Sequence, residues 1–209
     1  MNIYVDYDDC LCETGRSFSH LVYDMFRIDV PYEKMRYFNL QKSFDLDDEQ
    51  YALLLERGHE PDVLLSYEET PGASAVINEW LKQGHNVSII TGRPFNSFEP
   101  SRIWLDRHGF EDVNLYCLNK YGREQQFKDS EFSLELEDYL EMEFDFAIED
   151  SPSAFRLFDH LPDIKVLVFD RPWNRAEKFE NVNYRRCVDW ENIRKIVLNG
   201  ADPVNRKEI

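Results

Sequence analysis

The sequence predicts an α/β fold, a doubly wound parallel sheet that carries a small helical insertion after its first strand. Short runs of β-branched and aromatic residues alternate along the chain with segments whose apolar residues recur every three or four positions. Strands that alternate with helices favour right-handed crossovers and a parallel sheet covered on both faces. With 209 residues, 43% of them hydrophobic, the chain is long enough to bury the core of one such domain.

The opening strand is followed by a segment with helical rather than strand periodicity. Thr14 can cap a first helix, and a second helix begins near Asp47. Strand patterns return only after a Pro-Gly pair near residue 71. We therefore expect residues 14–70 to form a helical cap, inserted into an α/β core made of residues 1–13 and 71–209.

Beyond residue 70 the pattern alternates between strand and helix. Buried strands are predicted at 86–92, 113–118, 144–148 and 164–169. Helical stripes separate them, including an acidic segment from Phe132 to Met142 that we expect to be one helix. In parallel sheets, ligand sites form where the carboxyl ends of the strands meet, so the residues that follow each strand are the candidates for function.

Carboxylates follow two of the predicted strands. Asp6 and Asp8 come directly after the first strand and point to the same side of it, because strand side chains alternate. Glu149 and Asp150 follow the strand at 144–148. Clustered carboxylates repel one another unless a cation lies among them, and Mg²⁺ prefers oxygen ligands, so the pattern predicts a Mg²⁺ site.

Groups suited to an anion follow two other predicted strands. Thr91, Gly92 and Arg93 lie at the end of the strand and tight turn predicted at 86–92, and a hydroxyl with backbone amides can bind phosphate oxygens. Arg93 either contacts the phosphate or begins a helix at the surface. Lys120 follows the strand at 113–118 and is the favoured phosphate lysine. Lys128, which lies nearer to Asp150 in sequence, is the alternate.

This order of groups resembles the four-motif pattern of the haloacid dehalogenase superfamily, and within it the phosphatases. The motifs are Asp-Tyr-Asp at 6–8, Ser-Ile-Ile-Thr-Gly-Arg at 88–93, a lysine, and Ile-Glu-Asp-Ser-Pro at 148–152. The Thr-Gly-Arg-Pro run and the Phe-Asp-Arg-Pro-Trp-Asn run at 169–174 are similar to those of the 5'(3')-deoxyribonucleotidase-like group and its uncharacterised bacterial relatives. The resemblance covers residues 1–13 and 70–175.

The resemblance implies a mechanism with an aspartyl-phosphate intermediate. Asp6 is then the nucleophile, and Asp8 protonates the leaving alcohol and later activates water. It also implies that Mg²⁺ is held by Asp6, the main-chain carbonyl of Asp8 and the Asp150 carboxylate, with Glu149 supporting these ligands. The residues that it assigns to the phosphoryl oxygens are Thr91 and Lys120.

The chain departs from this pattern directly after the second aspartate. Members of the superfamily commonly have glycine and then threonine or valine there, whereas this chain has Asp9 and Cys10. A third acid beside the site either disturbs metal or substrate binding or faces solvent. A catalytically degenerate binding protein is therefore one alternative function. A phosphotransferase or mutase on the same scaffold is another.

Composition limits the partners of the protein. The net charge of −17 and the pI near 4.6 argue against a nucleic acid polymer, because such binding depends on cations that neutralise phosphates. No leader or membrane-spanning run is visible, and the four cysteines form no metal-binding pairs, so we expect a cytoplasmic protein with no membrane partner. The expected substrate is a nucleotide or another small phosphorylated metabolite, hydrolysed as a phosphomonoester.

Overall fold

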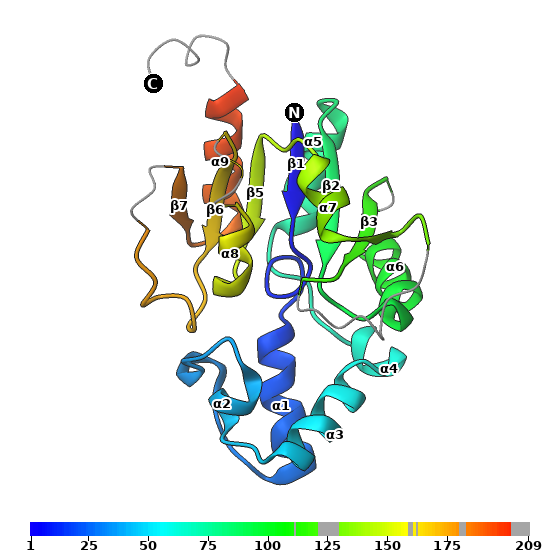
Figure 1. Cartoon of the computed structure of the whole chain (residues 1–209), viewed down its shortest axis with the longest axis vertical. Coiled ribbons are helices and arrows are strands. Elements are labelled where there is room, and N and C mark those ends of the chain that lie inside the picture. Colours follow the sequence, from blue (N-terminus) through cyan, green and yellow to red (C-terminus); the bar gives the residue numbers. More distant parts are fainter. Residues whose placement is uncertain (111, 121–129, 159–160, 162, 180–182, 202–209) are drawn as a thin grey trace.

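The computed structural model describes residues 1–110, 112–120, 130–158, 161, 163–179 and 183–201, and a parallel seven-stranded sheet lies at its centre (Figure 1). The strands are β1 (Asn2–Val5), β2 (Asn86–Thr91), β3 (Asn114–Leu118), β4 (Ser133–Leu134), β5 (Phe146–Glu149), β6 (Lys165–Phe169) and β7 (Tyr184–Cys187). Their order across the sheet is β4-β3-β2-β1-β5-β6-β7. The predicted α/β class with a doubly wound parallel sheet is confirmed, and β1 lies at its middle.

Helices cover both faces of the sheet. They are α5 (Ala73–Lys82), α6 (Phe98–Arg107), α7 (Leu136–Glu141), α8 (Pro152–Phe158) and α9 (Trp190–Ala201). Successive residues of β1 point to opposite faces. Ile3 and Val5 join the core that includes buried side chains of α5, α6 and α9, whereas Tyr4 joins the core that includes those of α7 and α8. This alternation is why the strand reads as continuously apolar in the sequence.

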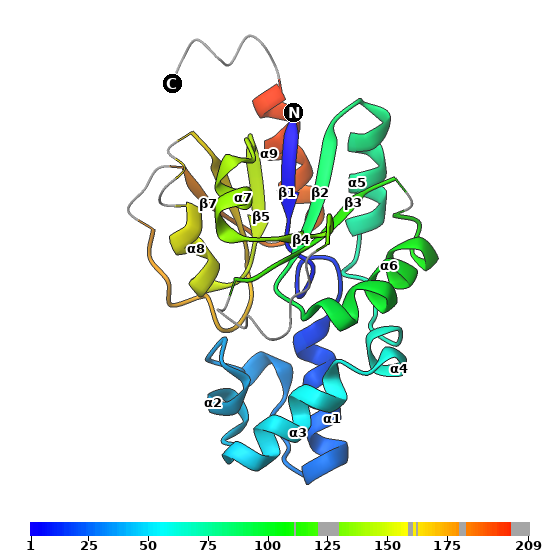
Figure 2. The ribbon, with the colours of Figure 1, turned by 45° about the vertical axis from the view of Figure 1, so that its right-hand side comes forward.

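The segment after β1 is helical, and it lies beyond the carboxyl end of that strand (Figures 1 and 2). It contains α1 (Thr14–Phe26), the 3₁₀ turn η1 (Tyr32–Lys34), α2 (Leu40–Phe44), α3 (Asp48–Gly58) and α4 (Pro61–Leu64). Asp47 caps α3 and forms a capping box with Gln50, as the acidic start of that helix predicts. None of the helices in the described ranges has both the length and the apolar character needed to cross a bilayer.

The start of α1 differs from the sequence prediction. Thr14 is the first residue of the helix and not its cap, and its Oγ1 donates a hydrogen bond to Asp8 Oδ1 at 2.6 Å. The carboxylate of Asp9 instead accepts the N–H of Gly15, at 3.0 Å from each oxygen. Asp9, which precedes the cap residue Glu13 in sequence, therefore satisfies one of the free N–H groups at the start of this helix.

Two paired segments connect the helical unit to the sheet. The N–H of Glu13 donates to the carbonyl of Glu68 at 2.9 Å, and the N–H of Thr70 donates to the carbonyl of Leu11 at 2.8 Å. Arg171, from the loop after β6, donates to Glu13 Oε1 at 3.5 Å and to Thr70 Oγ1 at 3.4 Å. The outgoing and returning chains thus form a short antiparallel ribbon that Arg171 ties to the core.

The helix predicted from Phe132 to Met142 is only half present. Ser133 and Leu134 form β4, which pairs with β3, and the helix is limited to α7. Phe132 stacks on Phe98 of α6, with ring centroids 5.0 Å apart. Pairing with the exposed edge of β3 therefore overrides the helical pattern of the first residues, and a capping box at Glu135 restarts the chain as a helix.

Strand β7 and helix α9 were not predicted. The Tyr-Arg-Arg-Cys sequence of β7 lacks a clear alternation, because this is an edge strand whose arginines contact solvent or neighbouring loops. The signal for α9 was present: Asp189 accepts the N–H of Asn192 at 2.7 Å, and the buried Trp190, Ile193 and Val197 recur at helical spacing.

Candidate active site

The end of β1 brings Asp6 and Lys120 into direct contact. The N–H of Asp6 donates to the carbonyl of Ile148 at 2.9 Å, which continues the pairing of β1 with β5 by one residue. Lys120 Nζ lies 2.6 Å from Asp6 Oδ1 and 3.2 Å from Glu149 Oε2, with its side chain 1% exposed. Lys120 therefore reaches the predicted nucleophile, as its place after β3 suggests. The alternate, Lys128, lies outside the described residues.

Glu149 acts as a buried acceptor that organises its neighbours. Its Oε2 accepts from Tyr4 Oη at 2.7 Å as well as from Lys120. Its Oε1 accepts the N–H groups of Asp150 at 3.1 Å and Ser151 at 3.0 Å. Glu149 thus fixes the turn after β5, on which Asp150 is presented. This arrangement is consistent with the supporting role expected from the sequence.

Asp150 is held by two residues that sequence reasoning did not assign to the site. Trp173 Nε1 donates to Asp150 Oδ2 at 2.8 Å, and Asn174 Nδ2 donates to the carbonyl of Asp150 at 2.8 Å. Both belong to the Phe-Asp-Arg-Pro-Trp-Asn run after β6, which is motif-like but carries no obvious chemistry of its own. Its position at a strand end was the available signal.

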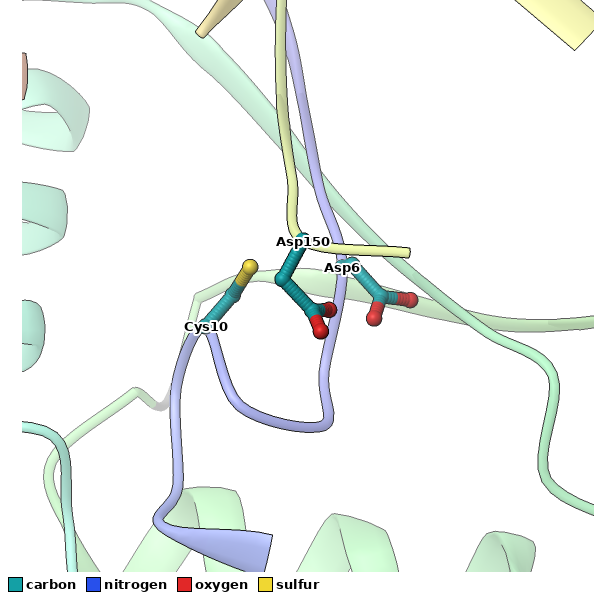
Figure 3. Close-up of side chains that lie close together, drawn as sticks. All are labelled: Asp6, Cys10 and Asp150. Atoms are coloured by element: carbon teal, nitrogen blue, oxygen red, sulfur yellow. The ribbon is translucent and has the colours of Figure 1, made fainter. Parts of the chain in front are cut away.

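Asp6 and Asp150 form the candidate metal site, and Figure 3 shows their carboxylates directed to the same region. One ligand atom from each of these residues and from Cys10 lies within 4.8 Å of the others. Burial, followed by the charge of Glu149, raises the pKa of both Asp6 and Asp150 well above the ordinary value. This buried negative charge and these carboxylate oxygens fit a hard divalent cation such as Mg²⁺, whereas the Cys10 thiol adds no ligand that Mg²⁺ prefers.

Asp8 is bound by Arg93 and Thr14 rather than directed at Asp6. Arg93 Nη2 lies 2.6 Å from Asp8 Oδ1, and Arg93 Nε lies 3.1 and 3.0 Å from the two Asp8 oxygens. Burial alone raises the pKa of Asp8, but the guanidinium charge and the hydrogen bonds from Arg93 and Thr14 outweigh it and lower that pKa below its ordinary value. Arg93 and Thr14 therefore hold the Asp8 carboxylate in one orientation.

Thr91 and Gly92 lie on the same turn as Arg93, at the end of β2. Thr91 is 1% exposed, and its Oγ1 accepts the N–H of Arg93 at 3.1 Å. Gly92 lines the same cavity as Asp6 and Asp8. The predicted phosphate-binding turn is therefore next to the predicted nucleophile. The Arg93 side chain, in contrast, contacts Asp8 and not open solvent.

Asp9 occupies a backbone conformation that explains the glycine expected from the resemblance. Its φ is +56°, in the left-handed region that glycine adopts freely and that aspartate tolerates better than most residues. Burial raises the pKa of Asp9 to about 7, with Arg171 opposing the shift. Arg171 Nε also donates to the carbonyl of Asp9 at 2.7 Å. Asp9 thus acts as part of the connection to α1 rather than as a solvent-facing acid.

A cavity of about 400 Å³ separates the strand ends from the helical unit. On the core side it is lined by Asp6, Asp8, Asp9, Gly92, Arg93 and Asp150. On the helical side its lining is mainly apolar or aromatic, with Phe18, Met35, Leu40, Leu55, Leu64 and Tyr67. Tyr23, on the same helix as Phe18, is 48% exposed and lines no part of this cavity.

The fold is shared with solved structures of haloacid dehalogenase hydrolases and phosphatases, as the motifs predicted. A predicted phosphatase from Clostridium acetobutylicum has a TM-score of 0.56 at 13% identity, covering 95% of this chain and 98% of its own. The HAD hydrolase YfnB from Bacillus subtilis, solved bound to magnesium, has a TM-score of 0.51 at 15% identity, covering 94% and 98%. The TM-scores show a shared fold, and at identities this low the likeness extends to the fold alone.

Sequence comparison identifies a distant relative of similar length. A protein of Oceanobacillus iheyensis named "Putative nucleotidase OB0422" is 23% identical over 196 residues, which covers 92% of this chain and 97% of the relative. No family model matches the sequence.

Proposed function

We propose that this protein is a Mg²⁺-dependent phosphomonoester hydrolase that acts through an aspartyl-phosphate. The observation that carries the proposal is the position of Asp6. Its carboxylate contacts the Lys120 ammonium group at 2.6 Å, lies within metal-sharing distance of Asp150, and lines the cavity beneath the helical unit. A nucleophile, a cation for the transferred oxygens and a pair of metal ligands are thus gathered at one place.

In the proposed reaction, a carboxylate oxygen of Asp6 attacks phosphorus while the bond from phosphorus to the leaving oxygen breaks. Asp8, protonated when the substrate binds, gives that proton to the leaving oxygen and then removes one from the water that hydrolyses the intermediate. Lys120 and the turn of Thr91 and Gly92 bind the phosphoryl oxygens. When bound by Asp6, Asp150 and the main-chain carbonyl of Asp8, Mg²⁺ offsets the repulsion between nucleophile and phosphate.

The helical unit is proposed to act as a cap that selects the leaving group. We assign residues 14–70 to this cap and residues 1–13 and 71–209 to the catalytic core. The apolar and aromatic side chains that the unit contributes to the cavity, Phe18 and Tyr67 among them, suit a leaving group with a flat or apolar body. The name of the Oceanobacillus relative supports a nucleotide, and another small phosphometabolite is the wider class.

The proposed compartment is the cytoplasm. The described cysteines, Cys10, Cys12, Cys117 and Cys187, are free and buried thiols. Free thiols are the usual state of cysteine in a reducing compartment. The four free thiols therefore support a cytoplasmic location and carry no information about the reaction.

The test is a substrate screen on purified protein together with a nucleophile variant. We expect phosphate release from a nucleotide or sugar phosphate with Mg²⁺ and none with EDTA. Asp6→Asn should reduce turnover by several orders of magnitude, whereas Asp24→Asn, a matched change at a side chain that is 75% exposed, should leave it intact. A tenth of wild-type activity in Asp6→Asn would contradict the covalent mechanism. Phosphate transfer to an added alcohol without net hydrolysis would indicate a phosphotransferase.

A further inference from the structure

We propose that Arg93 is a positioning residue for Asp8: its guanidinium holds the Asp8 carboxylate in the orientation that proton transfer at the leaving oxygen requires, and it does not bind the phosphoryl group. The inference rests on the proposed phosphomonoesterase activity. It replaces the phosphate-binding role that the sequence suggested for Arg93.

The hydrogen bonds of the guanidinium support this role. Nε and Nη2 donate to the two oxygens of Asp8 at 2.6–3.1 Å, which is the fork-to-carboxylate geometry that arginine favours. Nη1 donates to Ser101 Oγ at 2.8 Å, and Nη2 also lies 3.6 Å from Cys12 Sγ. Each guanidinium nitrogen therefore already donates to a protein atom.

Burial fixes the plane of this guanidinium. The Arg93 side chain is 4% exposed, and its Cζ lies 4.0 Å from the centre of the Tyr7 ring and 5.5 Å from that of Tyr67. Tyr7 is itself anchored, because its Oη donates to the carbonyl of Ser101 at 3.0 Å. An arginine that is buried beside two aromatic rings and hydrogen-bonded at three nitrogens has little freedom to turn toward a ligand.

The two oxygens of Asp8 have different surroundings. Oδ1 accepts from Arg93 Nη2 and from Thr14 Oγ1, both at 2.6 Å. Oδ2 accepts only from Arg93 Nε at 3.0 Å among the described residues. The Asp8 side chain is 31% exposed and lines the cavity, so Oδ2 is the oxygen with capacity for a proton from solvent or substrate. Holding Oδ1 with a guanidinium and a hydroxyl donor while Oδ2 keeps the capacity for a proton is the geometry of an oriented acid–base group.

The two possible roles of Arg93 predict different kinetics. Loss of a positioning residue weakens proton transfer, which matters for a poor leaving group such as a nucleoside and little for p-nitrophenolate. Loss of a phosphate ligand weakens every phosphate ester and inorganic phosphate alike. Because kcat/KM reports only the steps up to release of the leaving group, it separates this effect from hydrolysis of the intermediate.

The experiment measures Arg93→Met against wild type with the best nucleotide or sugar phosphate and with p-nitrophenyl phosphate. We expect kcat/KM to fall about 100-fold for the nucleotide or sugar phosphate. For p-nitrophenyl phosphate we expect it to fall by about tenfold or less. The inhibition constant of inorganic phosphate should stay within about threefold, since phosphate binding does not involve Arg93. In an Asp8→Asn background, Arg93→Met should have little further effect, because the two residues act as a unit.

Two other variants keep the inference testable if Arg93→Met fails to fold. Ser101→Ala removes only the Nη1 contact and should give a smaller loss with the same dependence on leaving group. Arg102→Met is the matched control: Arg102 contacts Asp106 and the carbonyls of Phe110 and Val113, and its loss should leave both substrates unaffected. If Arg93→Met does not fold, Ser101→Ala decides, and equal kcat/KM to wild type for both substrates would refute the inference.

A tenfold or larger rise in the inhibition constant of phosphate, with equal losses for both substrates, would also overturn the assignment of Arg93 and return it to phosphate binding. That result would leave the proposed function intact. Absence of Asp6-dependent turnover in the wild-type protein would instead overturn the proposed function, and the inference with it.

Discussion

Replacing Lys120 by methionine tests whether one ammonium group allows Asp6 and Glu149 to be buried together. The side chains of Lys120 and Glu149 are 1% and 0% exposed, and Nζ lies 2.6 and 3.2 Å from the two carboxylates. Removing one partner of a buried ion pair typically costs about 3–5 kcal/mol, because the remaining charge is left without compensation. At about 2–4 °C per kcal/mol for a chain of this size, the Tm in EDTA should fall by about 6–20 °C.

The assay is thermal unfolding followed by circular dichroism in EDTA, together with a double-mutant cycle. In an Asp6→Asn background, Lys120→Met should cost less than half as much, since one of the two uncompensated charges is already gone. Lys195→Met, at a side chain that is 64% exposed, is the control and should change Tm little. The same loss of Tm in both backgrounds would show that Lys120 stabilises the fold through packing alone and would refute the electrostatic reasoning.

Two further predictions concern residues around the candidate metal site. Trp173→Phe removes the donor to Asp150 Oδ2 and should weaken Mg²⁺ binding about 10–100-fold in a calorimetric titration; unchanged affinity would contradict the role of Trp173. Asp9→Asn retains an acceptor for the Gly15 N–H. Because the folded pKa of Asp9, about 7, lies above its unfolded value near 4, wild-type stability should fall relative to the variant as pH rises between these values. In EDTA, the Tm of Asp9→Asn relative to that of wild type should therefore be higher at pH 8 than at pH 4. An equal Tm difference at the two pH values would contradict this prediction.

The site residues that could be predicted from the sequence are those that follow a predicted strand. Asp6 and Thr91 come directly after an apolar run and Asp150 one residue later, and a parallel sheet collects such positions at one edge. Lys120 was placed by the same rule. The partner of Arg93 was not predictable, because a long flexible side chain reaches phosphate or a neighbouring carboxylate equally well and only packing decides between them.

The missed features depend on contacts between distant segments. Trp173 touches Asp150 only after β5 and β6 have paired, and Asp9 reaches Gly15 only because its backbone takes a left-handed turn. Strand β4 forms where local periodicity favours a helix, because β3 offers an unpaired edge. Helix α9 is the exception, since its capping residue and apolar spacing were visible in the sequence.

The ribbon formed by residues 11–13 and 68–70 makes the helical unit an exchangeable module. Its two ends leave the sheet as hydrogen-bonded neighbours, Glu13 beside Glu68 and Thr70 beside Leu11, so they are about 5 Å apart. A gap of that size can be closed by a two-residue hairpin turn or filled by any domain whose own termini are adjacent. Replacement of this unit during evolution would therefore leave unchanged the spacing of the strands that carry the candidate site. Under the proposed function, new substrates could then be acquired without rebuilding the proposed catalytic residues.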